Sequence, residues 1–408
     1  MQAGGRWAPG ERKTVWAGAG LVAACGVFAA DAVWANLVGH GANPFGDFFA
    51  LWSYARLVLL HPAARLYDPA WLHQAQVAMG MLPDTQAPFP YPPTFLLLVW
   101  PIGLLSFWGA YFAWVGATFC LYGLAICTGA RGRAATVAVL VLAPTTAVCV
   151  ASGQSGFLLA ALLVGGGRLM GRRPVLAGVL FGVLTYKPQF GLLVPVALVA
   201  AGRWRCIAAA CAATAALLAL DTVLFGAEVW GAWLGSLPGY ATLFDAATAG
   251  NRLLPTVLGN ALGLGLSHGA AQGVQLVAAL LAAAAVWTAW RRPGPFSAPV
   301  LLAATCLATP HAFLYDLPML SAAAVLLARH RLETSGAVPA GEAAGIVAAL
   351  MMPVPVVVFA SAVPVSTLAT AAFLGIALAA GRKGRVVRLR AGWGEGRPEA
   401  LPLDSAGA

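Results

Sequence analysis

Polar residues interrupt the long apolar stretches of this chain in a repeated pattern. Three stretches each contain two apolar arms, a polar break between them and arginines outside both arms. The breaks are residues 152–156, 186–189 and 309–316. An arm of about 12 to 17 helical residues spans only ~18 to 26 Å, less than the ~30 Å hydrocarbon core of a bilayer. The pattern therefore predicts helical hairpins whose polar breaks lie within one leaflet.

Each stretch could instead form one long tilted helix with a polar group at its middle. That arrangement would leave Lys187 near the bilayer centre, at about 2.5 to 3.5 kcal/mol on insertion scales. It would also put the flanking arginine clusters on opposite sides of the membrane. The hairpin interpretation agrees better with the tendency of Lys and Arg to remain in the cytoplasm.

The hairpins predict a polytopic protein with about twelve crossings and both termini in the cytoplasm. Of its 24 Lys and Arg residues, all but Arg56, Arg65, Lys187 and Arg252 then lie inside. The crossings are expected near residues 14–38, 107–128, 134–150, 156–167, 174–186, 189–201, 206–225, 271–290, 297–309, 317–328, 342–360 and 363–380. The basic N-terminus is interpreted as the start of a retained first helix, because no convincing cleavage site follows it.

Two segments are expected outside without crossing. Residues 39–106 include a mixed helix from Phe48 to Leu60 and a short apolar helix from Thr94 to Leu105, in or dipping into the outer leaflet. Residues 226–269 carry aromatic side chains typical of an interfacial belt or a lid. Residues 1–381 are thus predicted to form one integral membrane domain, and residues 382–408 a disordered basic cytoplasmic tail.

Composition agrees with this class. The chain of 408 residues is 60% hydrophobic and 9% charged. Its formal net charge of +10 would suggest an anionic partner in a soluble protein, but here it is mainly a topology signal facing anionic lipids, so nucleic acid is not an expected partner. The 7 cysteines lie in apolar runs without a CxxC pair, so the sequence predicts neither disulfides nor a metal site, and no cofactor is expected.

The candidate chemistry lies on the predicted outer side. There Asp47, Gln154, Lys187 with Gln189, and His311 with Asp316 can converge on one cavity. A carboxylate next to cationic groups in an apolar setting suits a lipid phosphate linked to a sugar. We interpret Asp47 as the base, and Lys187 and His311 as phosphate contacts. Tyr91 and Arg252, in the two outer segments, are further candidates for substrate binding.

Structural explanations compete with each of these roles. Asp47 could be a helix cap or a loop residue. Lys187 could extend to the membrane surface, and His311 could hydrogen-bond near a helix end. Gln154 and Gln189 could satisfy the ends of broken helices, and Asp316 could cap the helix that follows it.

Several motifs in order resemble a known family. They are the Asp47 loop, Leu66-Tyr67-Asp68, Phe89-Pro90-Tyr91-Pro92-Pro93, Gly153-Gln154, Tyr186-Lys187-Pro188-Gln189 before Arg203-Trp204-Arg205, and Pro310-His311 with Tyr315-Asp316. Together they are similar to glycosyltransferase family 87, the polyprenyl-phosphate-mannose-dependent α-mannosyltransferases of the GT-C superfamily. The resemblance covers roughly residues 15–330.

The resemblance implies a GT-C-like bundle with its active site on the outer face, a polyprenyl-phosphate-sugar donor, and Asp47 as the base. It also implies that Lys187 and His311 contact the donor phosphate. No Asp-x-Asp occurs in the first loop and the Gly153-Gln154 break carries no carboxylate, which disfavours the metal-dependent oligosaccharyltransferase branch. The sugar is not specified, because relatives could use other polyprenyl-linked hexoses or pentoses.

The sequence thus predicts a hexosyltransferase of the cell membrane, of mannosyltransferase type. It would transfer a sugar from a polyprenyl phosphate to a lipid or glycan acceptor, by inverting transfer without a metal. A transporter or lipid flippase is the main alternative, because broken helices also build transport sites. A structural partner without catalysis is a third possibility.

Overall fold

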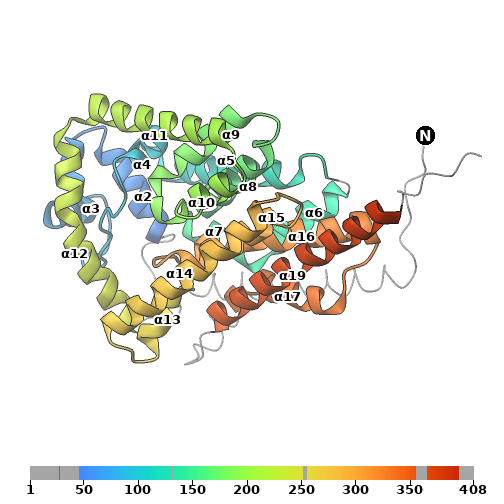
Figure 1. Ribbon diagram of the computed structural model, residues 1–408. Coiled ribbons are helices and arrows are strands. Elements are labelled where there is room, and N and C mark those ends of the chain that lie inside the picture. Colours follow the sequence, from blue (N-terminus) through green and yellow to red (C-terminus); the bar gives the residue numbers. More distant parts are fainter. Residues whose placement is uncertain (1–26, 28–45, 131, 251–254, 355–364, 395–408) are drawn as a thin grey trace, which may run out of the picture.

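The computed structural model describes residue 27 and residues 46–130, 132–250, 255–354 and 365–394. Across these ranges the regular secondary structure is helical, without a strand (Figure 1). The first half contains α2 (Gly46–Leu57), η1 (Ala63–Tyr67), α3 (Pro69–Ala78), α4 (Thr94–Val99), η2 (Trp100–Leu104), α5 (Phe107–Cys127), α6 (Arg133–Leu142), α7 (Pro144–Ser152), α8 (Gly156–Leu169), α9 (Pro174–Val183), η3 (Leu184–Tyr186), η4 (Pro188–Phe190) and α10 (Val194–Ala200). The second half contains α11 (Trp204–Phe225), α12 (Glu228–Gly250), α13 (Val257–Gly263), α14 (His268–Trp290), α15 (Ser297–Ala308), η5 (Leu314–Asp316), α16 (Pro318–Ser335), α17 (Ala340–Leu350) and α19 (Val365–Gly394).

Four described helices are long and apolar enough to cross a bilayer, namely α5, α11, α14 and residues 365–382 of α19. The pair α6 and α7, bent by 60° between them, makes a fifth if it is counted as one span. The all-helical, polytopic class is as predicted, but helix length and composition identify fewer than the twelve predicted crossings. The difference arises because many predicted crossings are the short arms of broken stretches. The predicted first crossing, 14–38, lies outside the described residues apart from Val27.

The short arms form the centre of the bundle, and long helices surround them. Most residues of α8 and nearly all of α15 are buried, whereas α11 buries only Cys206 and Asp221. A helix that is apolar all round and largely exposed suits contact with lipid. The breaks between short arms are thereby shielded by protein, which is where irregular backbone is tolerated at membrane depth.

The polar breaks end the helices where the sequence indicated. Gly153 stops α7 in the left-handed conformation, with φ of 61°, and α8 begins three residues later. Lys187 separates η3 from η4, and Thr309 ends α15 before η5. A continuous α-helix through these positions is therefore excluded. The hairpin-like interpretation of the three stretches is favoured over single tilted helices.

Small residues bring α9 and α11 into close contact. A Cβ atom on Gly178 would lie 2.5 Å from the carbonyl oxygen of Cys206, and one on Gly182 would lie 2.7 Å from Cβ of Ala213. The two glycines are one helical turn apart, on the same face of α9. Such small-residue spacing allows backbones to approach closely, which is the usual basis of helix association in lipid.

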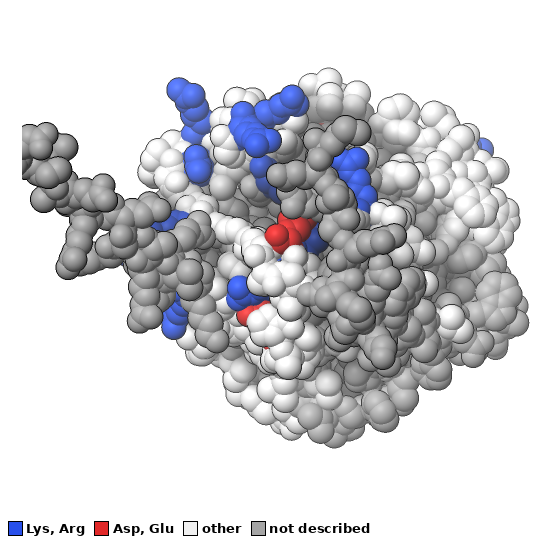
Figure 2. Space-filling model, turned by 90° about the vertical axis from the view of Figure 1, so that its right-hand side faces the viewer, with Lys and Arg blue, Asp and Glu red and all other residues white. Residues whose placement is uncertain are grey.

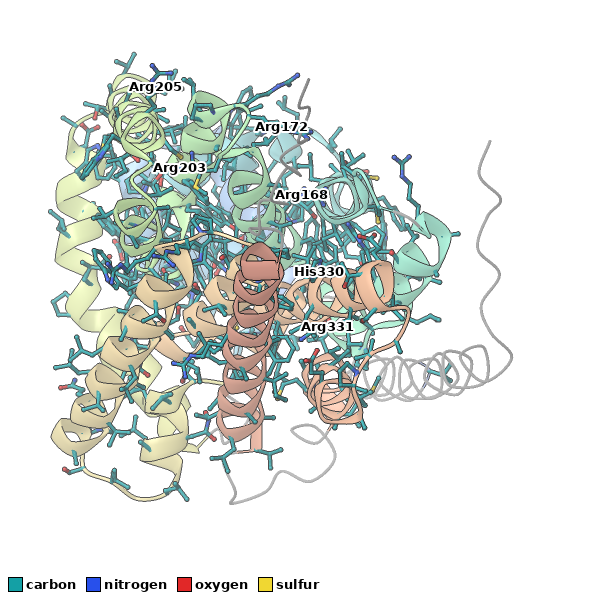
Figure 3. The ribbon with its side chains drawn as sticks, turned by 45° about the vertical axis from the view of Figure 1, so that its right-hand side comes forward. Arg168, Arg172, Arg203, Arg205, His330 and Arg331 are labelled. Carbon is teal, nitrogen blue, oxygen red and sulfur yellow. The ribbon has the colours of Figure 1, made fainter. Side chains whose placement is uncertain are left out.

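The segments that the sequence predicts outside and the arginine-rich loops occupy opposite ends of the molecule. In Figure 1, α2, α3 and α12 lie at the left, and the C-terminal part of α19 lies at the right. A second region, on the side turned toward the viewer in Figure 3, carries five arginines of α8, α11, α16 and the adjoining loops: Arg168, Arg172, Arg203, Arg205 and Arg331. We call this second region the basic end.

Several segment predictions can be compared directly with the helices. The mixed helix expected from Phe48 to Leu60 corresponds to α2, and the short apolar helix after Thr94 corresponds to α4 and η2. Asp68 accepts hydrogen bonds from the backbone N–H groups of Ala70 and Trp71 and so caps α3, a helix that the sequence analysis did not predict. Helix α19 continues to Gly394, past the expected start of the tail at residue 382.

Candidate active site

The three polar breaks lie against one another. The Tyr186 hydroxyl donates to the carbonyl oxygen of Ser155 at 3.3 Å, which joins the second break to the first. The Thr309 hydroxyl donates to the carbonyl oxygen of Gln189 at 3.2 Å, which joins the third break to the second. A Cβ atom on Gly156 would lie 1.8 Å from the carbonyl oxygen of Tyr315, so the first and third breaks also touch. The predicted convergence of the breaks is therefore observed.

A buried ion pair lies where the second and third breaks meet. Nζ of Lys187 is 2.7 Å from Oδ1 of Asp316, and the two side chains are 4% and 2% exposed. The second oxygen of Asp316, Oδ2, accepts the backbone N–H of Phe313 at 3.1 Å. The possibility that Lys187 extends to the membrane surface is thereby excluded. Both oxygens of Asp316 already have protein donors, so this residue orients Lys187 and shapes the break.

Aromatic rings surround the Lys187 ammonium. Nζ lies 5.9 Å from the ring centre of Tyr91, 5.7 Å from that of Phe190 and 5.2 Å from that of Tyr315. Cation–π attraction at these distances helps to offset the lost hydration of a buried charge. An ammonium carries three donors, and among the described residues only Asp316 accepts a hydrogen bond from Lys187. The remaining N–H bonds can donate to oxygens of a ligand.

Tyr91 and Gln154 complete this part of the site. The Tyr91 hydroxyl donates to Oε1 of Gln154 at 3.2 Å, and Gln154 is buried. The carbonyl oxygen of Gln154 lies 3.6 Å from the Cys149 thiol, which donates to it within the same turn. The sequence-based candidates Tyr91, Gln154, Lys187 and Asp316 thus form one connected cluster.

Tyrosine hydroxyls hold the segment that carries Tyr91. Tyr54 in α2 donates to the carbonyl oxygens of Ala87 and Pro88 at 3.0 and 2.7 Å. Tyr67 in η1 donates to the carbonyl oxygen of Tyr91 at 2.9 Å, and Tyr240 in α12 donates to that of Phe89. The sequence analysis did not single out these tyrosines as site residues. Three separate elements therefore fix the position of the Tyr91 ring over Lys187.

Asp47 lies in the first turn of α2, within electrostatic range of Lys187 and Asp316. Its side chain is accessible to solvent, yet nearby protein atoms remove much of its hydration. This desolvation raises the pKa of the Asp47 carboxyl from 3.8 to about 6. The Lys187 charge opposes the shift, and the Asp316 charge adds to it. A carboxyl in this range is largely ionised near neutral pH and can still accept a proton.

Three further candidates are His311, Gln189 and Arg252. His311 is half-buried in the third break, between Thr309 and η5, and Gln189 is half-buried in the second. Gln189 contributes its backbone carbonyl to the contact with Thr309. Arg252 lies outside the described residues.

A second buried carboxylate was missed from the sequence. Asp221, near the end of α11, is 0% exposed, and neither of its carboxylate oxygens has a hydrogen-bond partner within the described parts of the chain. It lies within electrostatic range of Tyr67. The signal available in the sequence was an acidic residue in the last turns of an apolar span, which is rare without a function or a partner. Among the described residues, no group of three or more His, Cys, Asp or Glu is arranged to hold a metal ion.

Comparison with known families identifies the class of the protein. The sequence profile of glycosyltransferase family 87 matches residues 89–310, more than half of the chain. The chain belongs to glycosyltransferase family 87. No curated protein and no solved structure gave a significant match. As a member of family 87 the protein is a glycosyltransferase, so the enzyme interpretation prevails over the transporter and the structural partner.

The family 87 match covers much of the cluster described above. Tyr91, Gln154, Lys187 and Gln189 lie within it, as does Arg252. Asp47 precedes the matched region, and His311 and Asp316 follow it. The site therefore combines side chains from the matched region with residues on either side of it.

Proposed function

We propose that this family 87 enzyme transfers a hexose, of mannosyl type, from a polyprenyl-phosphate donor to a lipid or glycan acceptor at the outer face of the cell membrane. The observation that carries the proposal is that Asp47 lies within electrostatic range of the buried Lys187–Asp316 pair. A carboxyl with a pKa of about 6 thus lies within electrostatic range of an ammonium that keeps donors for a ligand. An acceptor hydroxyl and a donor phosphate need these two groups, a base and a cation, close together.

In the proposed reaction Asp47 removes the proton of the acceptor hydroxyl. The acceptor oxygen forms a bond to the anomeric carbon while the bond from that carbon to the phosphate oxygen breaks. The electron pair leaves with the polyprenyl phosphate, and the configuration at the anomeric carbon inverts. No general acid is required, because a phosphate is a good leaving group.

Lys187 is proposed to favour the transition state over the ground state. The donor phosphate is a diester with one negative charge, and the departing monoester gains a second. A fixed ammonium in a site shielded from water stabilises the growing charge more than the initial one. Asp316 acts as a positioning residue for Lys187. His311, from the third break, is assigned to the phosphate, and Gln189, from the second, to the sugar.

The apolar helices supply the setting for a lipid-linked donor. The breaks are surrounded by helices such as α5 and α11 that are exposed and apolar. A polyprenyl chain can lie along such surfaces without leaving the bilayer. Helix α12 crosses the same end of the molecule (Figure 1), and Tyr240 joins it to the segment that carries Tyr91. We assign α12 as a lid over the site.

The decisive experiment measures sugar transfer by the purified protein in vesicles. Radiolabelled mannose, glucose and arabinose are each supplied on polyprenyl phosphate, and the same sugars are supplied on nucleotides, with membrane lipid extract as acceptor. We expect transfer from one or more polyprenyl donors and none from nucleotide sugars. Transfer from a nucleotide sugar alone would reject the proposed donor class.

A further inference from the structure

The basic end contains two neighbouring cavities that the proposed catalytic cluster does not use. The first, of about 250 Å³, lies between the end of α8, the loop from α14 to α15, and α16. The second, of about 320 Å³, lies between the same loop and α19. Both are lined by residues of the loop, Pro293, Gly294 and Pro295, and by Ser297. Figure 2 shows basic side chains around a smaller acidic area on this face.

Two guanidinium groups line the first cavity side by side. Arg168 donates to the carbonyl oxygens of Ala125 and Ile126 at 3.0 and 2.9 Å. Arg329 donates to the same Ile126 oxygen at 2.6 Å, and its Nε donates to Glu333 at 3.2 Å. Like charges that meet at one carbonyl repel each other, and Glu333 is the single carboxylate among the described lining residues. An anion in this cavity would relieve that repulsion.

Other features of the cavity favour an anion as well. Helix α15 begins at Ser297, so its N-terminus, the positive end of the helix dipole, faces the cavity. His330 is a further lining residue, and Figure 3 shows it in the same region as Arg168. In the neighbouring cavity Arg292 and Arg382 add two more cationic side chains. The two cavities together contain four arginines and one glutamate.

The apolar lining indicates that the anion belongs to a lipid. Met170, Trp290 and Leu326 line the first cavity alongside the arginines. Trp290 ends the candidate span α14, most of which is exposed as a lipid-facing helix would be. The cavity therefore lies where a span meets the membrane surface. Basic pockets between spans at that level suit lipid phosphates, whereas a free phosphate gains nothing from the apolar wall.

We propose that this cavity binds the phosphate group of an anionic phospholipid from the leaflet at the basic end, with Arg168 and Arg329 as its ligands. The lipid would link α8, α16 and the loop between α14 and α15. Its site lies at the opposite end of the molecule from α2 and α12. Binding is therefore independent of the glycosyl donor and of the catalytic proposal.

The test measures thermal unfolding of the full-length protein in detergent with added phosphatidylglycerol, phosphatidylcholine or inorganic phosphate. A ligand that binds only the folded state raises the unfolding midpoint, by an amount that grows with the ratio of ligand concentration to Kd. We expect phosphatidylglycerol to raise it and the other two to have little effect. In the variant that combines Arg168→Gln with Arg329→Gln, the lipid concentration needed for the same rise in midpoint should increase about tenfold or more, because charge-assisted contacts are lost. Arg205→Gln, an exposed arginine of the same end, serves as the matched control.

Two further variants keep the proposal falsifiable if the double glutamine variant does not fold. Arg168→Lys with Arg329→Lys keeps both charges and should keep most of the response. Glu333→Gln removes the carboxylate from the lining and should shift the response to lower lipid concentration. The proposal is overturned if the double glutamine variant responds as wild type does, if Glu333→Gln weakens the response, or if inorganic phosphate stabilises as well as the lipid.

Discussion

Lys187 and Asp316 form a buried ion pair at 2.7 Å across 129 residues of sequence. The pair joins the break between α9 and α10 to the break between α15 and α16. It also sets the geometry of the site, because three aromatic rings surround the same ammonium. A single contact thus serves the packing of the breaks and the placement of a cation within electrostatic range of Asp47.

Removing one partner of this pair should be more harmful than removing both. Lys187→Met leaves the Asp316 carboxylate buried without its cation, and such losses commonly cost about 3 to 5 kcal/mol. We expect Lys187→Met and Asp316→Asn each to lower the unfolding temperature and to reduce sugar transfer at least tenfold. The double variant Lys187→Met with Asp316→Leu should recover much of the unfolding temperature but not the transfer. Recovery of transfer as well would show that the ammonium has no role in the reaction.

Asp47→Asn separates basicity from shape. Asn can still hydrogen-bond a hydroxyl, but it cannot take its proton, and general-base catalysis commonly contributes ~10² to 10⁴ in rate. Transfer from the polyprenyl donor should fall by at least about a hundredfold with expression unchanged. Asp68→Asn, which retains the cap of α3, and Asp84→Asn, at an exposed position, are the controls and should remain active. If Asp47→Asn transfers sugar near the wild-type rate, Asp47 is not the general base.

The pH dependence of transfer should follow the Asp47 carboxyl. Because its pKa is raised to about 6, the ionised base is lost below that pH, and kcat/KM should fall tenfold per pH unit there and level off above it. A profile that is flat from pH 5 to pH 8 would be incompatible with Asp47 as the base.

The same pKa predicts how stability varies with pH. The folded protein holds the Asp47 proton more tightly than the unfolded chain does. The contribution of this carboxyl to the free energy of unfolding is therefore fully present below about pH 4, and it is lost as the pH rises through about 6. Asp47→Asn should therefore raise the unfolding temperature at pH 7.5 relative to wild type, and the difference should shrink at pH 4.5. Scanning calorimetry or a thiol-dye assay at the two pH values would measure it.

Gly156 should be intolerant of a side chain. Its Cβ atom would meet the carbonyl oxygen of Tyr315 at 1.8 Å, so Gly156→Ala must separate the first and third breaks. We expect a lower unfolding temperature and loss of transfer. Gly116→Ala in the middle of α5, where nothing lies within 4 Å, is the matched control and should be neutral or stabilise by about 0.5 to 1 kcal/mol. Equal effects of the two substitutions would contradict the close contact of the breaks.

Labelling from outside the cell tests the orientation. Asp84→Cys and Gly171→Cys introduce thiols at exposed positions near opposite ends of the molecule, in a background in which the exposed Cys120 and Cys211 are replaced by Ala. With the arginine-rich loops in the cytoplasm, an impermeant maleimide should label residue 84 in intact cells and residue 171 only after permeabilisation. Labelling of residue 171 in intact cells would reverse the topology and place the site inside.

The sequence alone determined the class of the protein and where its helices break. Apolar arms too short to cross, polar residues between them and arginines outside them are local features, and each follows from backbone hydrogen bonding in lipid. The same local features brought Gln154, Lys187 and Asp316 forward as candidates, and Tyr91 came from a predicted outer segment. Helix α3 was missed because Asp68 and Pro69 are equally suited to a turn and to a helix start.

Only the tertiary structure decided which groups face each other. Whether Lys187 is a free cation or half of an ion pair depends on how two hairpins pack, and no spacing along the chain encodes that. The same holds for Tyr54, Tyr67 and Tyr240, which come from three elements to hold one segment, and for the burial of Asp221 on an otherwise exposed helix. The physical reason is that local patterns set helices and breaks, whereas desolvation, pairing and pKa depend on neighbours that are distant in sequence.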